Sequence, residues 1–243
     1  MIVTDELNYN DASTICKGFI AYNKDFSSSR PTVMVAHDWG GRGNEACNKA
    51  IQLAKLGYVG FALDMYGQAQ VAFDKVEKRA LMTPFMNDRQ MLIKRIQSAF
   101  NLLTELPQVD KNNIAAIGYC FGGLCVLDLA RFGVDVKGVV SFHGVLKAPE
   151  EELFAPIKAK ILILHGYDDP LVKPEQVNQF AIEMSARKAD WQIHIYGNTA
   201  HSFTNPLAND DEMGLHYNEQ ADRRSWQATE VFLKEVFSGS GCL

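Results

Sequence analysis

Short apolar runs alternate along this chain with longer segments in which apolar residues recur at helical spacing. This alternation is typical of βαβ units, in which helices connect the strands of a mostly parallel sheet. Several runs are apolar almost throughout, as expected of strands whose two faces are both covered by helices. The strands predicted from these runs are 32–36, 58–63, 114–118, 136–142, 161–165 and 191–196.

Three segments are predicted to be helices from their apolar spacing. The first covers 47–54 and ends at Gly57, because a glycine after the last apolar position is a common helix stop. The second covers 92–103 and ends before Pro107, and the third covers 226–237. The pattern therefore predicts an α/β fold with a mostly parallel sheet and helices on both faces.

The remaining segments bear on domain organisation. Residues 15–23 are expected to add an edge strand or hairpin. Residues 67–87 are expected to be less regular, either as a cap over a pocket or as a long loop against the core. No Pro/Gly/Ser-rich or strongly charged stretch could link two domains, so 1–243 is predicted to be a single domain. Its last residues, 238–243, are expected to be a flexible tail.

Composition and charge exclude several classes of function. The 243 residues are 47% hydrophobic and 22% charged, which is typical of a globular protein. A net charge of -5 leaves no basic patch for nucleic acid or for an anionic membrane surface. Residues 1–10 lack the features of a signal peptide, and no apolar run is long enough to span a bilayer. We therefore expect a cytoplasmic monomer or small homo-oligomer whose partner is a small molecule.

The chain has five cysteines at irregular spacings, which does not suggest a disulfide framework or a zinc site. In a reducing compartment they are expected to be free thiols, and a free thiol can serve as a nucleophile. No pair of histidines has the spacing of metal ligands, so neither a metal nor another cofactor is predicted.

The strongest chemical motif is GYCFGG at 118–123, between an apolar strand and a helical pattern over 124–130. This G-x-C-x-G-G arrangement matches a nucleophile elbow with sulfur in place of the usual serine oxygen. The strained turn has no room for side chains two positions before and after the nucleophile, and glycines meet that demand. The dipole of the following helix favours the thiolate of Cys120. The alternative, a buried structural cysteine, is disfavoured by the flanking glycines.

Such a nucleophile needs a base, and the base needs an orienting acid. In this arrangement the chain order is nucleophile, acid, base. The loops after the last two predicted strands supply Asp168, Asp169 and His201. Asp169 is favoured over Asp168 because the proline after it holds it in an extended or turn conformation. Cys120, Asp169 and His201 are therefore the predicted catalytic triad.

The tetrahedral intermediate of acyl transfer needs hydrogen-bond donors for its oxyanion. One predicted donor is the backbone N–H of Phe121, directly after the nucleophile. The second is the backbone N–H of Trp39, in the loop HDWGGRG at 37–43 that follows the first predicted strand. A plain glycine-rich turn would explain the glycines of this loop but not its Asp and Trp.

Together these motifs resemble the dienelactone hydrolase family over nearly the whole chain. The cysteine elbow is the most specific of them. The resemblance implies an α/β-hydrolase fold and hydrolysis of a small carboxylic ester or lactone through an acyl-enzyme on Cys120, with Asp169 and His201 as the other triad members. The stretches that carry it are HDWGG at 37–41, ALDMYG at 62–67, GYCFGG at 118–123, 165–172 and HSFTNP at 201–206.

The resemblance also implies roles for further residues. A family glutamate that bonds the resting thiol and switches the nucleophile on falls on Asp38, whose side chain is one methylene shorter. Dienelactone-cleaving members hold the substrate carboxylate with arginines, one of them shortly after the catalytic histidine, where this chain has none. Arg89 and Arg42 could substitute, although an arginine is more often a surface or ion-paired residue. Phe203 is a further candidate substrate contact.

Two other functions remain open from the sequence. The same constellation would support an acyl transferase or thioesterase. A non-catalytic protein of this fold could instead use Cys120 as a redox-sensing thiol or bind a ligand. The intact base and acid argue against that second alternative.

Overall fold

The computed structural model describes residues 1–150 and 155–238 of the chain. The chain divides into two units, Met1–Ile117 and Gly118–Leu243. Of the predicted tail, only Ser238 belongs to the described residues, and Cys242 also lies outside them. A single domain over 1–243 stays a prediction from the sequence.

The sheet of the N-terminal unit begins with a β-hairpin. β1 (Ile2–Asp11) and β2 (Thr14–Asn23) pair antiparallel over their whole length. β2 pairs antiparallel with β4 (Val59–Leu63), and β4 pairs parallel with β3 (Arg30–Ala36). The strand or hairpin expected over 15–23 is therefore confirmed, with β1 as its partner.

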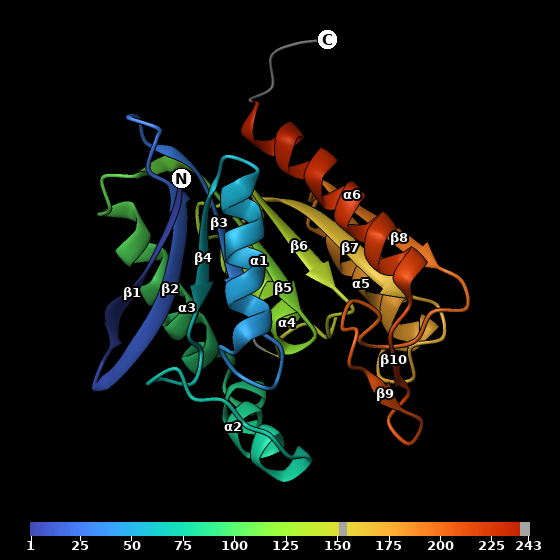
Figure 1. Cartoon of the computed structure of the whole chain (residues 1–243). Helices are drawn as coiled ribbons and strands as arrows, with labels where there is room; N and C mark the ends of the chain where they lie inside the picture. Colours follow the sequence, from blue (N-terminus) through green and yellow to red (C-terminus); the bar gives the residue numbers. More distant parts are fainter. Residues whose placement is uncertain (151–154, 239–243) are drawn as a thin grey trace. The chain divides into compact units, whose positions relative to one another are not determined.

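Helices pack on these strands (Figure 1). α1 (Asn44–Lys55) packs on β2, β3 and β4, and the chain turns after it at Gly57, whose φ of 94° suits only glycine well. α2 (Lys75–Asn87) and α3 (Arg89–Thr104) pack on each other, and α3 also packs on β1. β5 (Val109–Tyr119) follows α3 in the chain.

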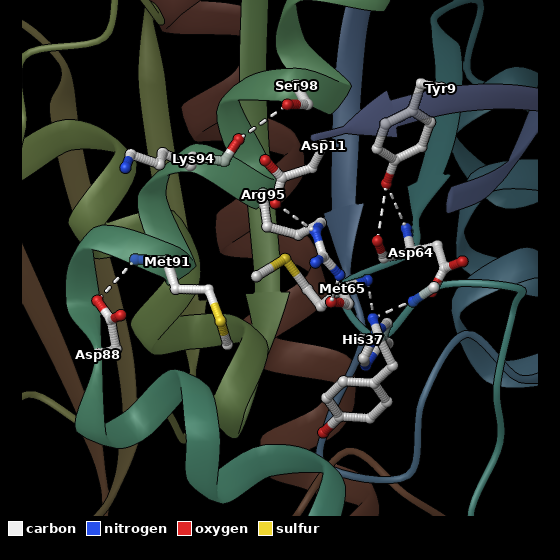
Figure 2. A network of polar contacts seen from close by, with 12 residues as sticks. Tyr9, Asp11, His37, Asp64, Met65, Asp88, Met91, Lys94, Arg95 and Ser98 are labelled. Atoms are coloured by element: carbon white, nitrogen blue, oxygen red, sulfur yellow. Dashed lines mark hydrogen bonds and ion pairs between the residues drawn. The ribbon is translucent and has the colours of Figure 1, made fainter. Parts of the chain in front are cut away.

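A buried carboxylate organises the loop that follows β4 (Figure 2). Tyr9 Oη accepts from the N–H of Asp64 and donates to its carbonyl oxygen, both at 2.9 Å. The side chain of Asp64 is fully buried and its oxygens accept hydrogen bonds of 2.7–3.1 Å. The donors are the backbone N–H groups of Lys17, Tyr66, Gly67 and Ala69. These donors offset the lost hydration of the carboxylate and hold the loop in one conformation.

The C-terminal unit contains a parallel sheet. β6 (Gly138–Phe142), β7 (Lys160–Gly166) and β8 (Trp191–Tyr196) pair parallel in that order. α4 (Phe121–Arg131) packs on β6, and α6 (Glu219–Phe237) packs on β6 and β7. Because the strands are parallel, the loops that follow them emerge at the same edge, where α/β sheets bind ligands.

Smaller elements complete this unit. α5 (Pro174–Ala186) connects β7 to β8, and β9 (Asn209–Asp210) pairs antiparallel with β10 (Leu215–His216). None of the described helices is both long and apolar enough to cross a lipid bilayer.

The predicted α/β class with a mostly parallel sheet is confirmed. Every strand predicted from an apolar run is present, and the largest difference in boundaries is at β5, which begins at Val109. β3 and β4 pair parallel, as do β6, β7 and β8, whereas the antiparallel pairs all involve β2 or the short β9 and β10.

The expectation of an irregular segment over 67–87 is wrong from residue 75 onward, where α2 begins. Asp74 caps this helix by accepting from the N–H groups of Val76 and Glu77. Pro84 lies inside the helix, and Phe85 is its one buried residue. A helix with so little buried surface leaves no apolar period in the sequence.

β1 and α5 were not predicted either, for a similar reason. Tyr9 is the one buried residue of β1, and Phe180 and Met184 are the buried residues of α5. Elements that cover a core with one or two side chains look polar in sequence.

The Asp64→Ala variant should lose about 3–5 kcal/mol of unfolding free energy, because several buried N–H groups lose their acceptor at once. Urea denaturation measures this loss. Asp5→Ala is the control, since exposed Asp5 accepts, among the described residues, only from the neighbouring Glu6 N–H and should change stability by less than about 0.5 kcal/mol. Equal losses in the two variants would contradict the role assigned to Asp64.

Candidate active site

Cys120 stands at the start of α4 in a strained backbone conformation. Its φ of 53° and ψ of -113° lie outside the regions favoured by residues with a side chain. Its N–H donates to the carbonyl oxygen of Phe142 at 3.0 Å, which ties the turn to the end of β6. The thiol is free and half-buried. The positive end of the α4 dipole lies at this residue and favours a thiolate there.

The glycines of the elbow are required by close backbone approach. A Cβ at Gly118 would lie 2.0 Å from the carbonyl oxygen of Gly122. A Cβ at Gly123 would lie 2.4 Å from Ser141 Oγ, on β6. Any larger residue at either position would push α4 away from its neighbours and move Cys120.

Asp169 and His201 come together from the loops after β7 and β8. His201 Nδ1 donates to Asp169 Oδ2 at 2.7 Å, and the two residues are 1% and 3% exposed. The other carboxylate oxygen accepts from the N–H groups of Leu171 at 2.8 Å and Val172 at 3.2 Å. Asp168, the rival acid, is exposed and makes no contact with His201 among the hydrogen bonds of the described residues.

The environment of His201 favours its protonated form. Burial alone would lower its pKa, but the interaction with Cys120 and the hydrogen bond to Asp169 raise the pKa from 6.5 to about 10. Nε2 is buried and makes no well-aligned hydrogen bond within 1–150 and 155–238, although Cys120 is near enough to raise the pKa of the ring. Since Nδ1 is used by Asp169, Nε2 is the atom left to exchange a proton with the thiol or a substrate.

Two further imidazoles surround His201 and stay neutral. Burial and the charge of His201 lower the pKa of His143, and burial lowers the pKa of His165. The His143 ring meets the His201 ring edge-on, with centroids 5.0 Å apart, and its Nε2 lies 2.8 Å from Thr204 Oγ1. In the sequence His143 directly follows the predicted strand 136–142, and His165 ends the predicted strand 161–165. Their place at the carboxyl ends of β6 and β7 was the one available signal.

The loop after β3 carries the other predicted donor and the predicted gate. Trp39 is partly exposed, and its backbone N–H donates to no described residue. Asp38 Oδ1 accepts from the N–H of Gly40 at 2.8 Å, so one carboxylate oxygen is used within its own loop. Phe121, the other predicted donor, is the first residue of α4.

The residues proposed to contact substrate differ in their surroundings. Arg42 forms an ion pair with Glu6 and donates to Cys47 Sγ at 3.3 Å, so it already has a structural role. Arg89 is the buried first residue of α3. Phe203 is fully buried, with its ring 5.1 Å from that of His143.

Taken together, the C-terminal unit holds the His201 ring against the buried Asp169 carboxylate and under the influence of Cys120. Within residues 1–150 and 155–238, no group of three His, Cys, Asp or Glu side chains is arranged to hold a metal ion.

Comparison with known proteins indicates a hydrolase family. The model of the "Dienelactone hydrolase family" matches residues 17–237. An uncharacterized protein of Caenorhabditis elegans is 40% identical over 159 residues, 63% of this chain and 99% of that protein. A carboxymethylenebutenolidase homolog of Xenopus tropicalis is 26% identical over 187 residues, 74% of this chain and 73% of that protein.

A solved structure covers almost the whole chain. The crystal structure of a dienelactone hydrolase-like promiscuous phosphotriesterase from metagenomic libraries is 36% identical, with a TM-score of 0.91, and covers 97% of this chain and 98% of its own. Solved α/β hydrolases at lower identity share the fold. The predicted α/β-hydrolase fold is therefore confirmed.

The Cys120→Ala variant should lower the pKa of His201, because it removes the negative charge that raises this pKa while burial continues to lower it. In the wild type, protonation of His201 stabilises the fold fully below pH 6.5, and this stabilisation is lost as the pH rises through about 10. The imidazole titration is measured by NMR. Cys125→Ala is the control, and a His201 pKa unchanged by Cys120→Ala would contradict the thiolate–imidazolium pair.

Proposed function

Since the chain belongs to the dienelactone hydrolase family, we propose that it hydrolyses small carboxylic esters or lactones through an acyl-enzyme on Cys120. The observation that carries this proposal is the 2.7 Å hydrogen bond between His201 and the buried Asp169, beside a cysteine in a strained turn. The expected cytoplasmic location, small oligomeric state and absence of a nucleic-acid partner remain predictions from the sequence.

In the first half of the proposed reaction, His201 holds the proton that Cys120 has lost, and the thiolate attacks the substrate carbonyl carbon. The C–O bond to the leaving group then breaks, and the His201 imidazolium gives its proton to the departing alkoxide. Asp169 keeps the imidazole in the orientation in which Nε2 faces the reaction. The raised pKa of His201 supports this assignment, because the imidazolium is then present at neutral pH.

In the second half, neutral His201 takes a proton from water, and the resulting hydroxide attacks the thioester. The C–S bond breaks, which releases the carboxylic acid and restores the thiolate–imidazolium pair. The neutral state of His143 and His165 suits this cycle, because a second positive charge beside His201 would oppose its protonation.

The oxyanion formed in both halves is stabilised in this proposal by the backbone N–H groups of Phe121 and Trp39. Asp38 is the proposed gate of the nucleophile, although its bond to Gly40 N–H engages one oxygen. Arg89 and Phe203 are the proposed substrate contacts. Because Arg42 is already paired with Glu6, it is a weaker candidate for holding a substrate carboxylate.

A second candidate function is phosphotriester hydrolysis, favoured by the 36% identity to a promiscuous phosphotriesterase. The Cys120 thiolate would displace a good leaving group at phosphorus, and water would release the phosphodiester. We expect diethyl p-nitrophenyl phosphate to release p-nitrophenolate with wild-type protein and not with Cys120→Ala. Absence of release by the wild type, measured by absorbance, would remove this candidate.

The main test uses p-nitrophenyl acetate. Cys120→Ala should lower kcat by about 1000-fold or more, because no nucleophile remains to form the thioester. Cys120→Ser should keep part of the activity, since its hydroxyl occupies the same turn. Mass spectrometry of the wild type during turnover should find one acetyl group on Cys120.

Cys47→Ala is the matched control, because Cys47 is also free and half-buried but lies in α1. It should leave kcat unchanged. Equal turnover by wild type and Cys120→Ala would exclude the acyl-enzyme on this residue.

A further inference from the structure

The carbonyl oxygen of the peptide between Asp38 and Trp39 is held in place by hydrogen-bond donors. His37 Nδ1 lies 2.5 Å from Asp38 O, and the N–H of Gly41 donates to the same oxygen at 3.4 Å. His37 is 2% exposed, so water does not compete for these contacts. The carbonyl of this peptide is therefore fixed by a side chain from the preceding residue.

The other ring nitrogen determines which proton His37 carries. The backbone N–H of Met65 donates to His37 Nε2 at 3.2 Å, so Nε2 has no hydrogen (Figure 2). The proton of the neutral ring is consequently on Nδ1, which donates it to Asp38 O. Burial lowers the pKa of His37 and keeps the ring neutral, despite the opposing influence of Asp38 and Asp64.

Met65 is itself anchored, which makes His37 part of a rigid network. Arg95 Nη1 donates to the carbonyl oxygen of Met65 at 2.6 Å, and Arg95 Nε donates to Asp11 Oδ2 at 2.8 Å (Figure 2). The next peptide of the loop is held too, because Tyr66 Oη donates to the carbonyl oxygen of Trp39 at 3.0 Å. Both carbonyls around Trp39 are thus fixed by buried donors of the N-terminal unit.

Fixing a carbonyl also aims the N–H of the same peptide. In a trans peptide the C=O and N–H bonds point in opposite directions, so a bond to Asp38 O directs the Trp39 N–H away from His37. A donor on the carbonyl also polarises the peptide and makes its N–H a stronger donor. The Trp39 N–H has no acceptor among the described residues, so it is available to an external one.

We propose that His37 is a positioning residue that orients and polarises the Trp39 N–H as an oxyanion donor. This inference rests on the proposed function, in which Trp39 serves the oxyanion. The role belongs to the Nδ1 donor, whereas the contact of Nε2 with Met65 only holds the ring in place.

Two substitutions of His37 separate the role of the Nδ1 donor from the contact of Nε2 with Met65. Both His37→Leu and His37→Asn lose the contact with Met65, but the Asn side-chain amide places an N–H where Nδ1 stood. We expect kcat for p-nitrophenyl acetate to fall about 10-fold to 100-fold in His37→Leu, with KM little changed, and to recover most of this loss in His37→Asn. Equal kcat values in the two variants would overturn the proposal.

The rate at which iodoacetamide alkylates Cys120 separates the two roles. If His37 only stabilised the fold, His37→Leu would change this rate. This displacement occurs at a methylene carbon and develops no oxyanion, so His37→Leu should alkylate at the wild-type rate. Tyr9→Phe is the matched control, because it removes buried hydrogen bonds to Asp64 elsewhere in the same network and should lower the denaturation midpoint without lowering kcat. A slower alkylation in His37→Leu, or an equal kcat loss in Tyr9→Phe, would contradict the inference.

A second readout does not depend on ester turnover. The amide proton resonance of Trp39 should shift upfield in His37→Leu and stay near its wild-type position in His37→Asn, because the donor on Asp38 O is lost only in the first. If the wild type hydrolyses no ester, the proposed function fails, and this resonance alone decides whether His37 orients the peptide. An unchanged resonance in His37→Leu would overturn the inference.

Discussion

The hydrogen bond between the buried Asp169 carboxylate and His201 is the interaction on which the proposed chemistry depends. A carboxylate that is 3% exposed is costly unless its oxygens find donors. Asp169 has three, the N–H groups of Leu171 and Val172 and the ring of His201. Two of them belong to the carboxylate's own loop, so the loop holds Asp169 still and leaves one oxygen for the imidazole. The orientation of the His201 ring is therefore a consequence of how the Asp169 carboxylate is buried and bonded.

The N-terminal unit also contains a buried carboxylate that is bonded to the backbone of its own loop. Asp64 is also buried and also accepts from the backbone of the loop in which it lies. It thereby fixes the segment whose Met65 N–H determines the tautomer of His37. In both units a carboxylate after a strand makes a loop rigid, and a histidine bonded to that loop has a defined proton. Rigid loops of this kind hold a reacting group in place without cost at the moment of reaction.

Electrostatics divide the buried histidines into two groups. His201 faces Cys120 and the Asp169 carboxylate, and its pKa rises despite burial. His37, His143 and His165 are also buried, and their pKa values fall. Burial lowers the pKa of each ring, and the carboxylates near His37 and His165 do not outweigh it. At His201 the combined influence of Cys120 and Asp169 does. In the proposed reaction His201 is the general acid, so it must be protonated while the neighbouring imidazoles stay neutral.

The sequence by itself determined the α/β class, the order of the buried strands and the motif at Cys120. These properties follow from local patterns, because apolar runs predict strands and the elbow turn requires glycines two positions before and after the nucleophile, at Gly118 and Gly122. β1, α2 and α5 were missed because they bury few side chains. The proline after Asp169 already favoured it over Asp168 in the sequence, and Asp169 is the residue that bonds to His201. Contacts between residues distant in the chain have no local pattern, so only the tertiary structure placed His143 against the His201 ring and bonded His37 to Met65. Hydrogen bonds and pKa shifts depend on which groups are buried together, and burial is decided when the strands pair and the helices pack on them.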